Sequence, residues 1–315
     1  MRALVTGIDG FAGHHLAALL RRVGHDVRGT VRAADRLARL APLGLAGDAL
    51  RVADVTDPAA VSAAVAAARP EWLFHLAART FVPDAAVDPA AIFTVNATGT
   101  LHVLDAVARH APRCRVVVVG SADAYGAVPE AEQPIVETRP LRPLSGYGAS
   151  KAAAELLGRQ WADGGGLDIV CVRPFNHTGP GQDARFVCAD FAAQLLGVKH
   201  GERPARIEVG DLDPVRDFSD VRDVVAGYVA VAERGATGAV YNVCSGVGRR
   251  IGAVLDELIA AVGVDVEVTS VAARRRPQRI ATLVGSNAAL RALGWQPTIA
   301  WAQTVGELMA AKTPR

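Results

Sequence analysis

The sequence predicts an α/β protein built on a doubly wound parallel sheet, with a smaller, interwoven C-terminal lobe. Short apolar runs alternate with Ala-rich helical segments throughout the first half of the chain. Four consecutive valines in the stretch 115–120 are typical of a central strand that helices cover on both faces. After Arg173 the alternation breaks into Gly- and Pro-rich loops and shorter elements, which indicates the second lobe.

The N-terminus carries the motif that organises the first half. Residues 2–6 form an apolar run, Gly7, Gly10 and Gly13 follow as G-x-x-G-x-x-G, and a second strand is predicted over 26–31. Apolar residues at helical spacing predict a helix between them, from residue 14 to residue 23. Strand, glycine turn, helix and strand within about 30 residues make up the Rossmann-type unit that binds a dinucleotide.

The glycines have a physical purpose in such a unit. A pyrophosphate must approach main-chain N–H groups at a helix N-terminus, where free donors and the helix dipole favour an anion. Side chains would block that approach, and Gly13 lets the helix pack closely on the strand. The alternative is a glycine turn that packs a helix on a strand and binds no ligand.

The end of the second strand bears on the choice of dinucleotide. An acidic residue there would bind the ribose 2′-hydroxyl of NAD, whereas an arginine accommodates the 2′-phosphate of NADP. This chain has Arg32 at that place and Arg36 four residues on, with no carboxylate at the strand end. The sequence therefore favours NADP(H), unless both arginines are solvated surface residues.

Further elements follow in the order strand, helix, strand, helix, strand. Asp57 is a predicted N-cap and precedes proline at the first helical position. His75 lies in an apolar run and is interpreted as a packed core histidine. The predicted strands are 50–54, 71–78 and 115–120, and the predicted helices are 57–68 and 88–110.

Candidate catalytic residues lie where strands of such a sheet end. Ser121 comes directly after the valine strand, and Tyr147 and Lys151 open a later helix. Residues four apart lie on one helix face, so the lysine charge is expected to lower the tyrosine pKa and the lysine could also hold the nicotinamide ribose. Ser121 would add a hydroxyl to the substrate oxygen. A tyrosine and a lysine at this spacing are common on ordinary helices, so the strand and glycine motif are needed to support the interpretation.

Composition limits the function classes. The 315 residues are half hydrophobic and 21% charged, and a net charge of +2 gives no indication of nucleic acid or membrane binding. No apolar run reaches the roughly 18 residues of a membrane span. The four cysteines fit neither a metal pattern nor a disulfide framework, so we expect no metal site and a cytoplasmic location.

Over nearly its whole length, the chain resembles the extended short-chain dehydrogenase/reductase superfamily, also called the NAD-dependent epimerase/dehydratase family. The segments that carry the resemblance are TGIDGFAG at 6–13, HLAA at 75–78, NATGT at 96–100, SADAYG at 121–126 and YGASK at 147–151. RPFNHTGPGQ at 173–182 is similar to a stretch of the GDP-6-deoxy-4-keto-mannose reductases (GDP-rhamnose synthases). Residues 209–223, YNVCSG at 241–246 and LRALGWQP at 290–297 are similar to segments that these reductases share with GDP-mannose 4,6-dehydratases.

The resemblance implies two domains with different binding roles. Residues 1–172 would form the dinucleotide-binding domain, to which roughly 215–246 return, and 173–315 would form mainly the nucleotide-sugar-binding lobe. A homodimer is implied through a four-helix bundle that pairs the helices 96–109 and 147–162. The implied cofactor contacts are Gly7, Gly10, Phe11, Ala12, Gly13, Arg32, Asp54, Val55, Leu76, Ala77, Ala78, Tyr147, Lys151 and Pro174.

The substrate of such a lobe would be a nucleotide sugar, whose diphosphate needs cations and amide donors. The candidates are Asn176, Lys199, Arg216 and Arg276. The resemblance places Asn176 and Arg216 on the diphosphate, and Arg276 precedes a proline as in the family's Arg-Pro motif. Each arginine taken alone could equally be a surface residue.

Two departures from the family pattern bear on the reaction. Dehydratases resemble Thr-Ser-Glu where this chain has Ser121, Ala122 and Asp123, so the acid that serves water elimination is one methylene shorter here. The stretch 274–279 also departs from the usual residues after the proline. We therefore expect NADPH-dependent reduction of the C4 ketone of a GDP-4-keto-6-deoxyhexose. The alternatives are a 4,6-dehydratase or C4-epimerase that retains its cofactor, and a non-catalytic dinucleotide sensor.

Overall fold

A computed structural model describes residues 1–81, 87–274 and 280–310. Within them, seven parallel strands form the main sheet in the order β10-β6-β5-β4-β1-β2-β3. The strand order reverses beside β1, which is the arrangement of a doubly wound sheet. The strands are β1 (Arg2–Thr6), β2 (Asp26–Val31), β3 (Leu50–Val52), β4 (Trp72–His75), β5 (Arg115–Val119), β6 (Ile169–Pro174) and β10 (Val240–Val243).

Helices cover both faces of this sheet, and the valine strand shows why. Val117 and Val119 of β5 pack in the cluster that faces α1 and α8, whereas Val116 and Val118 pack on the opposite side against α2, α5 and α6. A strand buried on both faces needs apolar residues at every position, so the predicted α/β class and doubly wound sheet are confirmed. The helices are α1 (Phe11–Arg22), α8 (Val221–Arg234), α2 (Pro58–Ala68), α5 (Gly99–His110) and α6 (Gly146–Asp163).

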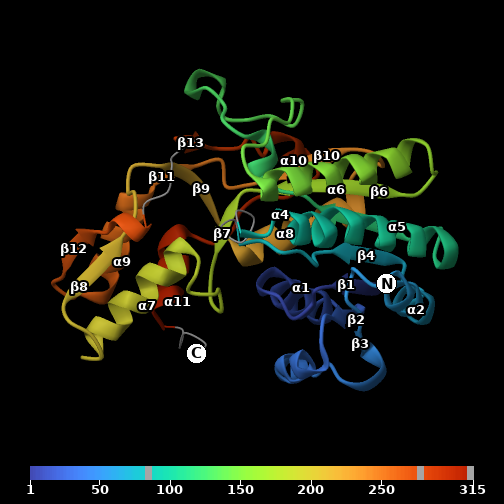
Figure 1. Cartoon of the computed structure of the whole chain (residues 1–315), viewed down its shortest axis with the longest axis horizontal. Helices are drawn as coiled ribbons and strands as arrows, with labels where there is room; N and C mark the ends of the chain where they lie inside the picture. The colour runs from blue at the N-terminus through green and yellow to red at the C-terminus, as the bar shows by residue number, and fades with distance from the viewer. Residues whose placement is uncertain (82–86, 275–279, 311–315) are drawn as a thin grey trace.

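The second lobe lies beside the sheet, with α7, α9 and α11 around the β8 and β12 pair (Figure 1). A small mixed sheet, in which β9 pairs with β7, β11 and β13, stands between this group and the main sheet. The elements are β7 (Asn176–Thr178), α7 (Val187–Lys199), β8 (Arg206–Val209), β9 (Val215–Asp220), β11 (Gly248–Arg250), α9 (Ile251–Val262), β12 (Glu267–Ser270), β13 (Thr282–Leu283) and α11 (Trp301–Ala310). The chain thus returns to the main sheet through α8 and β10 after building part of this lobe.

Short helical turns complete the described chain. Most of them connect the elements of the sheet, and α10 packs beside β10. They are η1 (Ala34–Leu43), η2 (Gly47–Ala49), α4 (Pro89–Phe93), η3 (Thr94–Thr98), η4 (Ala122–Tyr125), η5 (Glu130–Glu132), η6 (Ala272–Arg274) and α10 (Ala288–Ala292).

Several element boundaries differ from those predicted, for physical reasons. Helix α1 begins at Phe11 because Gly10 already acts as its N-cap, and β3 and β4 end before their predicted last residues. The single helix predicted over 88–110 is divided by the π-helical turn η3. Asn96 in that turn bonds the backbone of Arg79 and the hydroxyl of Ser150, which holds it away from regular α-helical geometry.

The helical stretch Pro89–His110 and the side chain of His75 both bear on predictions about the core. The stretch Pro89–His110 does have the length and mean hydropathy of a membrane span, contrary to the expectation that no run would reach it. Half of its most apolar window is buried inside the molecule, as in a helix that packs in a protein core. His75 is confirmed as a core histidine, because it bonds the hydroxyls of Thr6 and Thr100, and burial lowers its pKa to about 3.

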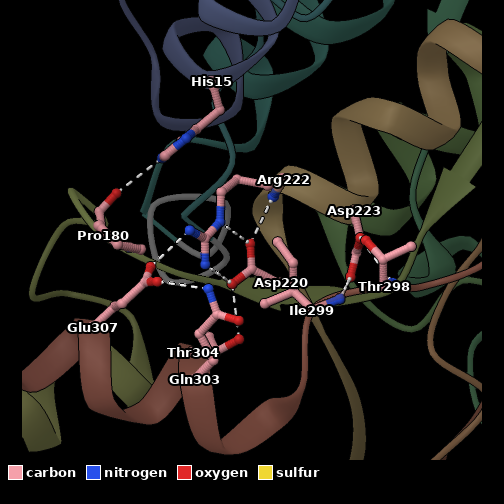
Figure 2. A network of polar contacts seen from close by, with 10 residues as sticks. All are labelled: His15, Pro180, Asp220, Arg222, Asp223, Thr298, Ile299, Gln303, Thr304 and Glu307. Carbon is pink, nitrogen blue, oxygen red and sulfur yellow. Dashed lines mark hydrogen bonds and ion pairs between the residues drawn. The ribbon is translucent and has the colours of Figure 1, made fainter.

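A polar network connects the C-terminal helix to the strand and helix that link the two lobes (Figure 2). Arg222 at the start of α8 pairs with Asp220 and with Glu307 of α11, at 2.8 and 2.7 Å. Thr304 of α11 also donates to Asp220, at 2.8 Å. These contacts fix α11 against β9 and α8, beside the loop whose Pro180 carbonyl bonds His15 of α1.

Candidate active site

One large cavity of about 1180 Å³ lies at the carboxyl ends of the parallel strands, between the main sheet and the second lobe. Residues from both halves of the chain line it. Among them are most of the sequence-predicted site residues, namely Gly7, Gly10, Phe11, Ala12, Gly13, Arg32, Asp54, Val55, Leu76, Ala77, Ala78, Ser121, Asp123, Tyr147, Lys151, Pro174, Asn176 and Arg216.

The glycine loop has the shape that a dinucleotide requires. Gly7 has a φ of +66°, and a Cβ there would lie 2.9 Å from the Ala77 Cα. A Cβ on Gly13 would lie 2.4 Å from the Gly7 carbonyl oxygen. Gly10 caps α1 without a side-chain hydrogen bond, so the first-turn N–H groups of the helix face the cavity. This loop fits a pyrophosphate at a helix N-terminus.

Charged residues line the part of the cavity beside the end of β2. Arg32 is exposed there, and the Arg36 guanidinium donates to the Asp9 carboxylate at 2.8 Å. Asp54 accepts from the backbone and hydroxyl of Thr56, at 2.9 and 2.8 Å. Both arginines thus lie where the sequence predicted them, but the partner of Arg36 is a residue of the glycine loop that no motif singled out.

The candidate catalytic side chains converge on one wall of the cavity. Ser121 follows β5 as the N-cap of η4, and Ser145 caps α6 so that Tyr147 lies in its first turn. The Ser121 side chain lies close enough to the Tyr147 phenol to act on its pKa. The Lys151 ammonium donates to the Val119 carbonyl at 2.7 Å. Helix α6 and the end of β5 therefore bring together groups that lie about 30 residues apart.

Burial moves the pKa values of this cluster toward the uncharged forms. The pKa of Tyr147 is raised, first by burial and then by the charge of Asp123, while the nearby Ser121 hydroxyl opposes the shift. Burial lowers the pKa of Lys151 to about 8. The expectation that Lys151 lowers the pKa of Tyr147 is wrong for this arrangement, because burial raises that pKa and Lys151 donates to a backbone carbonyl instead.

Asp123 and Arg216 form the charged end of the same wall. Burial raises the pKa of Asp123, and the charge of Arg216 opposes that shift. Arg216 itself donates to the carbonyls of Val215, Ile280 and Ala281, at 2.8 to 3.1 Å. These bonds orient the guanidinium at the cavity edge, close enough to Asp123 for the two charges to interact.

A buried network of hydrogen bonds connects the segments that carry the catalytic candidates. Arg173 of β6 donates to both carboxylate oxygens of Glu155 on α6, at 2.7 and 2.6 Å, and also to the Tyr125 hydroxyl at 2.7 Å. Tyr125 donates onward to Asn242 of β10. Because Tyr125 ends the η4 turn that begins after Ser121, the network links the two segments that carry the catalytic candidates.

Two of the predicted substrate residues are not brought to this cavity. Lys199 is exposed at the last residue of α7 and is not among the cavity-lining residues, because that helix runs away from the main sheet. Arg276 lies outside the described residues. Asn176, in β7, is exposed and lines the cavity as predicted.

Several lining residues carried no sequence signal. Phe81 and Phe186 make an edge contact with ring centroids 6.0 Å apart, and the Arg185 guanidinium lies over the Phe81 ring. Tyr228 of α8 is buried and also reaches the cavity. These residues lie just outside the motifs, so only the three-dimensional arrangement identifies them as part of the cavity wall.

Comparison with known proteins gives one consistent result. The family profile described as GDP-mannose 4,6 dehydratase matches residues 4–308. The chain is 36% identical over 310 residues to GDP-6-deoxy-D-mannose reductase of Pseudomonas aeruginosa, a match that covers 98% of this chain and 96% of the relative.

Solved structures agree with that result. The chain is similar to the structure of RMD from Pseudomonas aeruginosa complexed with NADPH, with a TM-score of 0.82, 34% identity and 98% of both chains covered. It is also similar to UDP-glucose 4-epimerase of Thermus thermophilus in complex with NAD, with a TM-score of 0.85, 30% identity and 98% of both chains covered. Both neighbours therefore share the whole fold, and their titles name different dinucleotides.

Proposed function

Because this chain belongs to the GDP-mannose 4,6 dehydratase family of extended short-chain dehydrogenases/reductases, we propose that it reduces the C4 ketone of a GDP-4-keto-6-deoxyhexose to a GDP-6-deoxyhexose with NADPH. The observation that carries the proposal is the buried Tyr147 phenol, which lines the same cavity as Ser121, Lys151 and the glycine loop. The similarity to a GDP-6-deoxy-D-mannose reductase over nearly the full length supports the substrate class.

The residues of the cluster take distinct parts in this reaction. When bound, the nicotinamide supplies the hydride that reduces C4. Tyr147 donates its proton to the oxygen that becomes an alkoxide, and its raised pKa keeps the phenol protonated at neutral pH. Ser121 holds that oxygen by a second hydrogen bond. Lys151 would hold the ribose hydroxyls of the cofactor, and Asp123 lines the same wall of the cavity.

Two observations support NADP(H) over NAD(H). Arg32 and Arg36 line the cavity beside the end of β2, where an adenosine 2′-phosphate would need cations. The similar reductase structure contains NADPH, while other neighbours contain NAD. Within the cavity, Gly7, Gly10 and Gly13 and the first turn of α1 receive the pyrophosphate.

The nucleotide-sugar diphosphate would bind at the other end of the cavity. Asn176 and Arg216 both line it and offer an amide and a guanidinium. A homodimer would pair α5 and α6 of two copies, and the exposed Leu101 and Leu156 on these helices support that pairing.

The test is incubation of the purified protein with GDP-4-keto-6-deoxymannose and NADPH, followed by NADPH absorbance and identification of the product. Stoichiometric NADPH consumption with formation of a GDP-6-deoxyhexose is expected, and the C4 configuration of the product names the sugar. Tyr147→Phe should lower kcat by about 10²-fold to 10⁴-fold while NADPH still binds. Undiminished turnover in Tyr147→Phe would contradict the assigned proton donor.

A 4,6-dehydratase is the second candidate, because Asp123 is an acid beside Tyr147 with a raised pKa. Such an enzyme regenerates its cofactor in each turnover. Conversion of GDP-mannose to its 4-keto-6-deoxy product without added cofactor, with no NADPH consumption on the keto sugar, would replace the reductase by the dehydratase. Asp123→Asn would then be expected to abolish the conversion.

A further inference from the structure

An acid in the glycine loop pairs with an arginine from the segment that follows β2. Asp9 precedes Gly10, and its side chain is 7% exposed. Its carboxylate pairs at 2.8 Å with Arg36, whose side chain is 30% exposed. Backbone bonds hold the loop around Asp9, since the Gly10 N–H donates to the Gly7 carbonyl at 3.0 Å. The carboxylate is therefore a fixed charge and not a mobile surface group.

The pair occupies a functionally defined place. Asp9 and Arg36 line the large cavity together with Thr30 and Arg32. In a strand-glycine turn-helix-strand unit, the glycine loop and the end of the second strand enclose the adenosine ribose. The charges near that position are thus the Arg32 and Arg36 guanidiniums and the Asp9 carboxylate, and Asp54, which accepts from Thr56, adds a second carboxylate.

We infer that Asp9 limits the preference for 2′-phosphorylated over unphosphorylated adenine dinucleotides by acting as the counter-charge of Arg36. The inference rests on the proposed function, in which the same cavity binds NADP(H). It assigns to Asp9 a specificity role that neither the cofactor motif nor the two arginines suggest.

The charges of Arg36 and Asp9 act in opposite directions on a 2′-phosphate. A 2′-phosphate brings a charge between −1 and −2 near neutral pH, and Arg36 attracts it while the adjacent carboxylate repels it. With Asp9 present, the charge of Arg36 is balanced by its partner, and Arg32 is a further cation in this part of the cavity. An unphosphorylated ribose loses nothing from the carboxylate, since its hydroxyls can donate hydrogen bonds to it. Replacing Asp9 by a neutral isostere should therefore tighten binding of the phosphorylated ligand selectively.

The test measures binding of the adenosine half alone, so that no catalysis is involved. Dissociation constants of ADP-ribose and of its 2′-phosphorylated form are determined by calorimetry for the wild-type protein, Asp9→Asn and Asp9→Ser. Both variants should raise the preference for the 2′-phosphate by at least about fivefold, mainly through tighter binding of the phosphorylated ligand. Arg36→Ala should lower the preference.

Asp35→Asn is the matched control, because Asp35 is exposed next to Arg36 and does not line the cavity. It removes the same charge and should leave the preference unchanged. An unchanged or lowered preference in both Asp9 variants would overturn the inference and indicate that Asp9 orients Arg36 toward the phosphate. If the wild-type protein binds neither ligand, the proposed dinucleotide function fails as well, which separates the two conclusions.

Discussion

Tyr147 and Lys151 lie one helical turn apart, and burial moves both toward their neutral forms. The pKa of Tyr147 is raised, and the pKa of Lys151 is lowered to about 8. For a phenol that donates a proton this shift is useful, because the group remains protonated at neutral pH. For the lysine it means that the ammonium is present below about pH 8 and is lost above it.

This lysine pKa predicts a pH dependence of cofactor binding. If the ammonium of Lys151 holds the cofactor ribose as proposed, the dissociation constant of NADPH should increase as pH rises through about 8. Fluorescence titration with NADPH at pH values on either side of this point measures the effect. Lys151→Met, of similar length, should bind more weakly and show no such step. A flat profile in the wild-type protein would contradict the role of the charge.

At the scale of elements, α6 and β6 are joined by one fully buried ion pair. Glu155 and Arg173 are only 1% and 3% exposed. Removing one partner of such a pair leaves an uncompensated charge in the interior. Glu155→Gln should therefore lower the free energy of unfolding by about 3 to 5 kcal/mol, measured by chemical denaturation. As a control, Glu130→Gln on the exposed turn η5 should change the free energy of unfolding by less than about 0.5 kcal/mol. An equally small effect of Glu155→Gln would show that the buried pair is dispensable.

The glycine loop and the C-terminal helix offer a matched pair of substitutions. A Cβ on Gly13 would meet the Gly7 carbonyl oxygen, whereas nothing lies within 4 Å of a Cβ on Gly306. Gly13→Ala should reduce thermal stability and weaken NADPH binding, because the loop must move away from α1. Gly306→Ala should stabilise α11 by up to about 1 kcal/mol and leave binding unchanged. Thermal denaturation with and without NADPH distinguishes these outcomes, and normal NADPH binding by Gly13→Ala would contradict the close packing of the loop.

At the scale of the whole molecule, the main sheet depends on residues far along the chain. Strand β10 pairs with β6, and α8 covers one face with Val221, Val224 and Tyr228. The ion pairs of Arg222 then join α8 to α11, so that α11 is fixed to the end of β9 and the start of α8 (Figure 2). The cavity is built only when both halves of the chain are present.

This arrangement predicts the behaviour of a fragment. Residues 1–172 alone would expose the face of the sheet that α8 covers and leave β6 without a partner on one side. The fragment should show no cooperative thermal transition by circular dichroism, in contrast to the full chain. A cooperative transition close to that of the full chain would mean that the first half folds independently.

The sequence alone determined the features that depend on local patterns. Apolar periodicity predicted the parallel sheet, the glycine spacing predicted the loop at α1, and the four-residue spacing placed Tyr147 and Lys151 on one helix face. These features follow from chain geometry within one or two elements, where 3.6 residues make a helical turn and alternate strand residues face opposite sides.

Only the tertiary structure decided which charges meet and how burial changes them. Arg36 pairs with Asp9, 27 positions away, and Arg173 pairs with Glu155, while Lys199 is carried away from the cavity by α7. The sequence could not indicate these results, because ion pairing and pKa depend on distance and solvent exposure, which many remote elements determine together. The proposed cofactor choice and proton donation thus depend on contacts that no local motif contains.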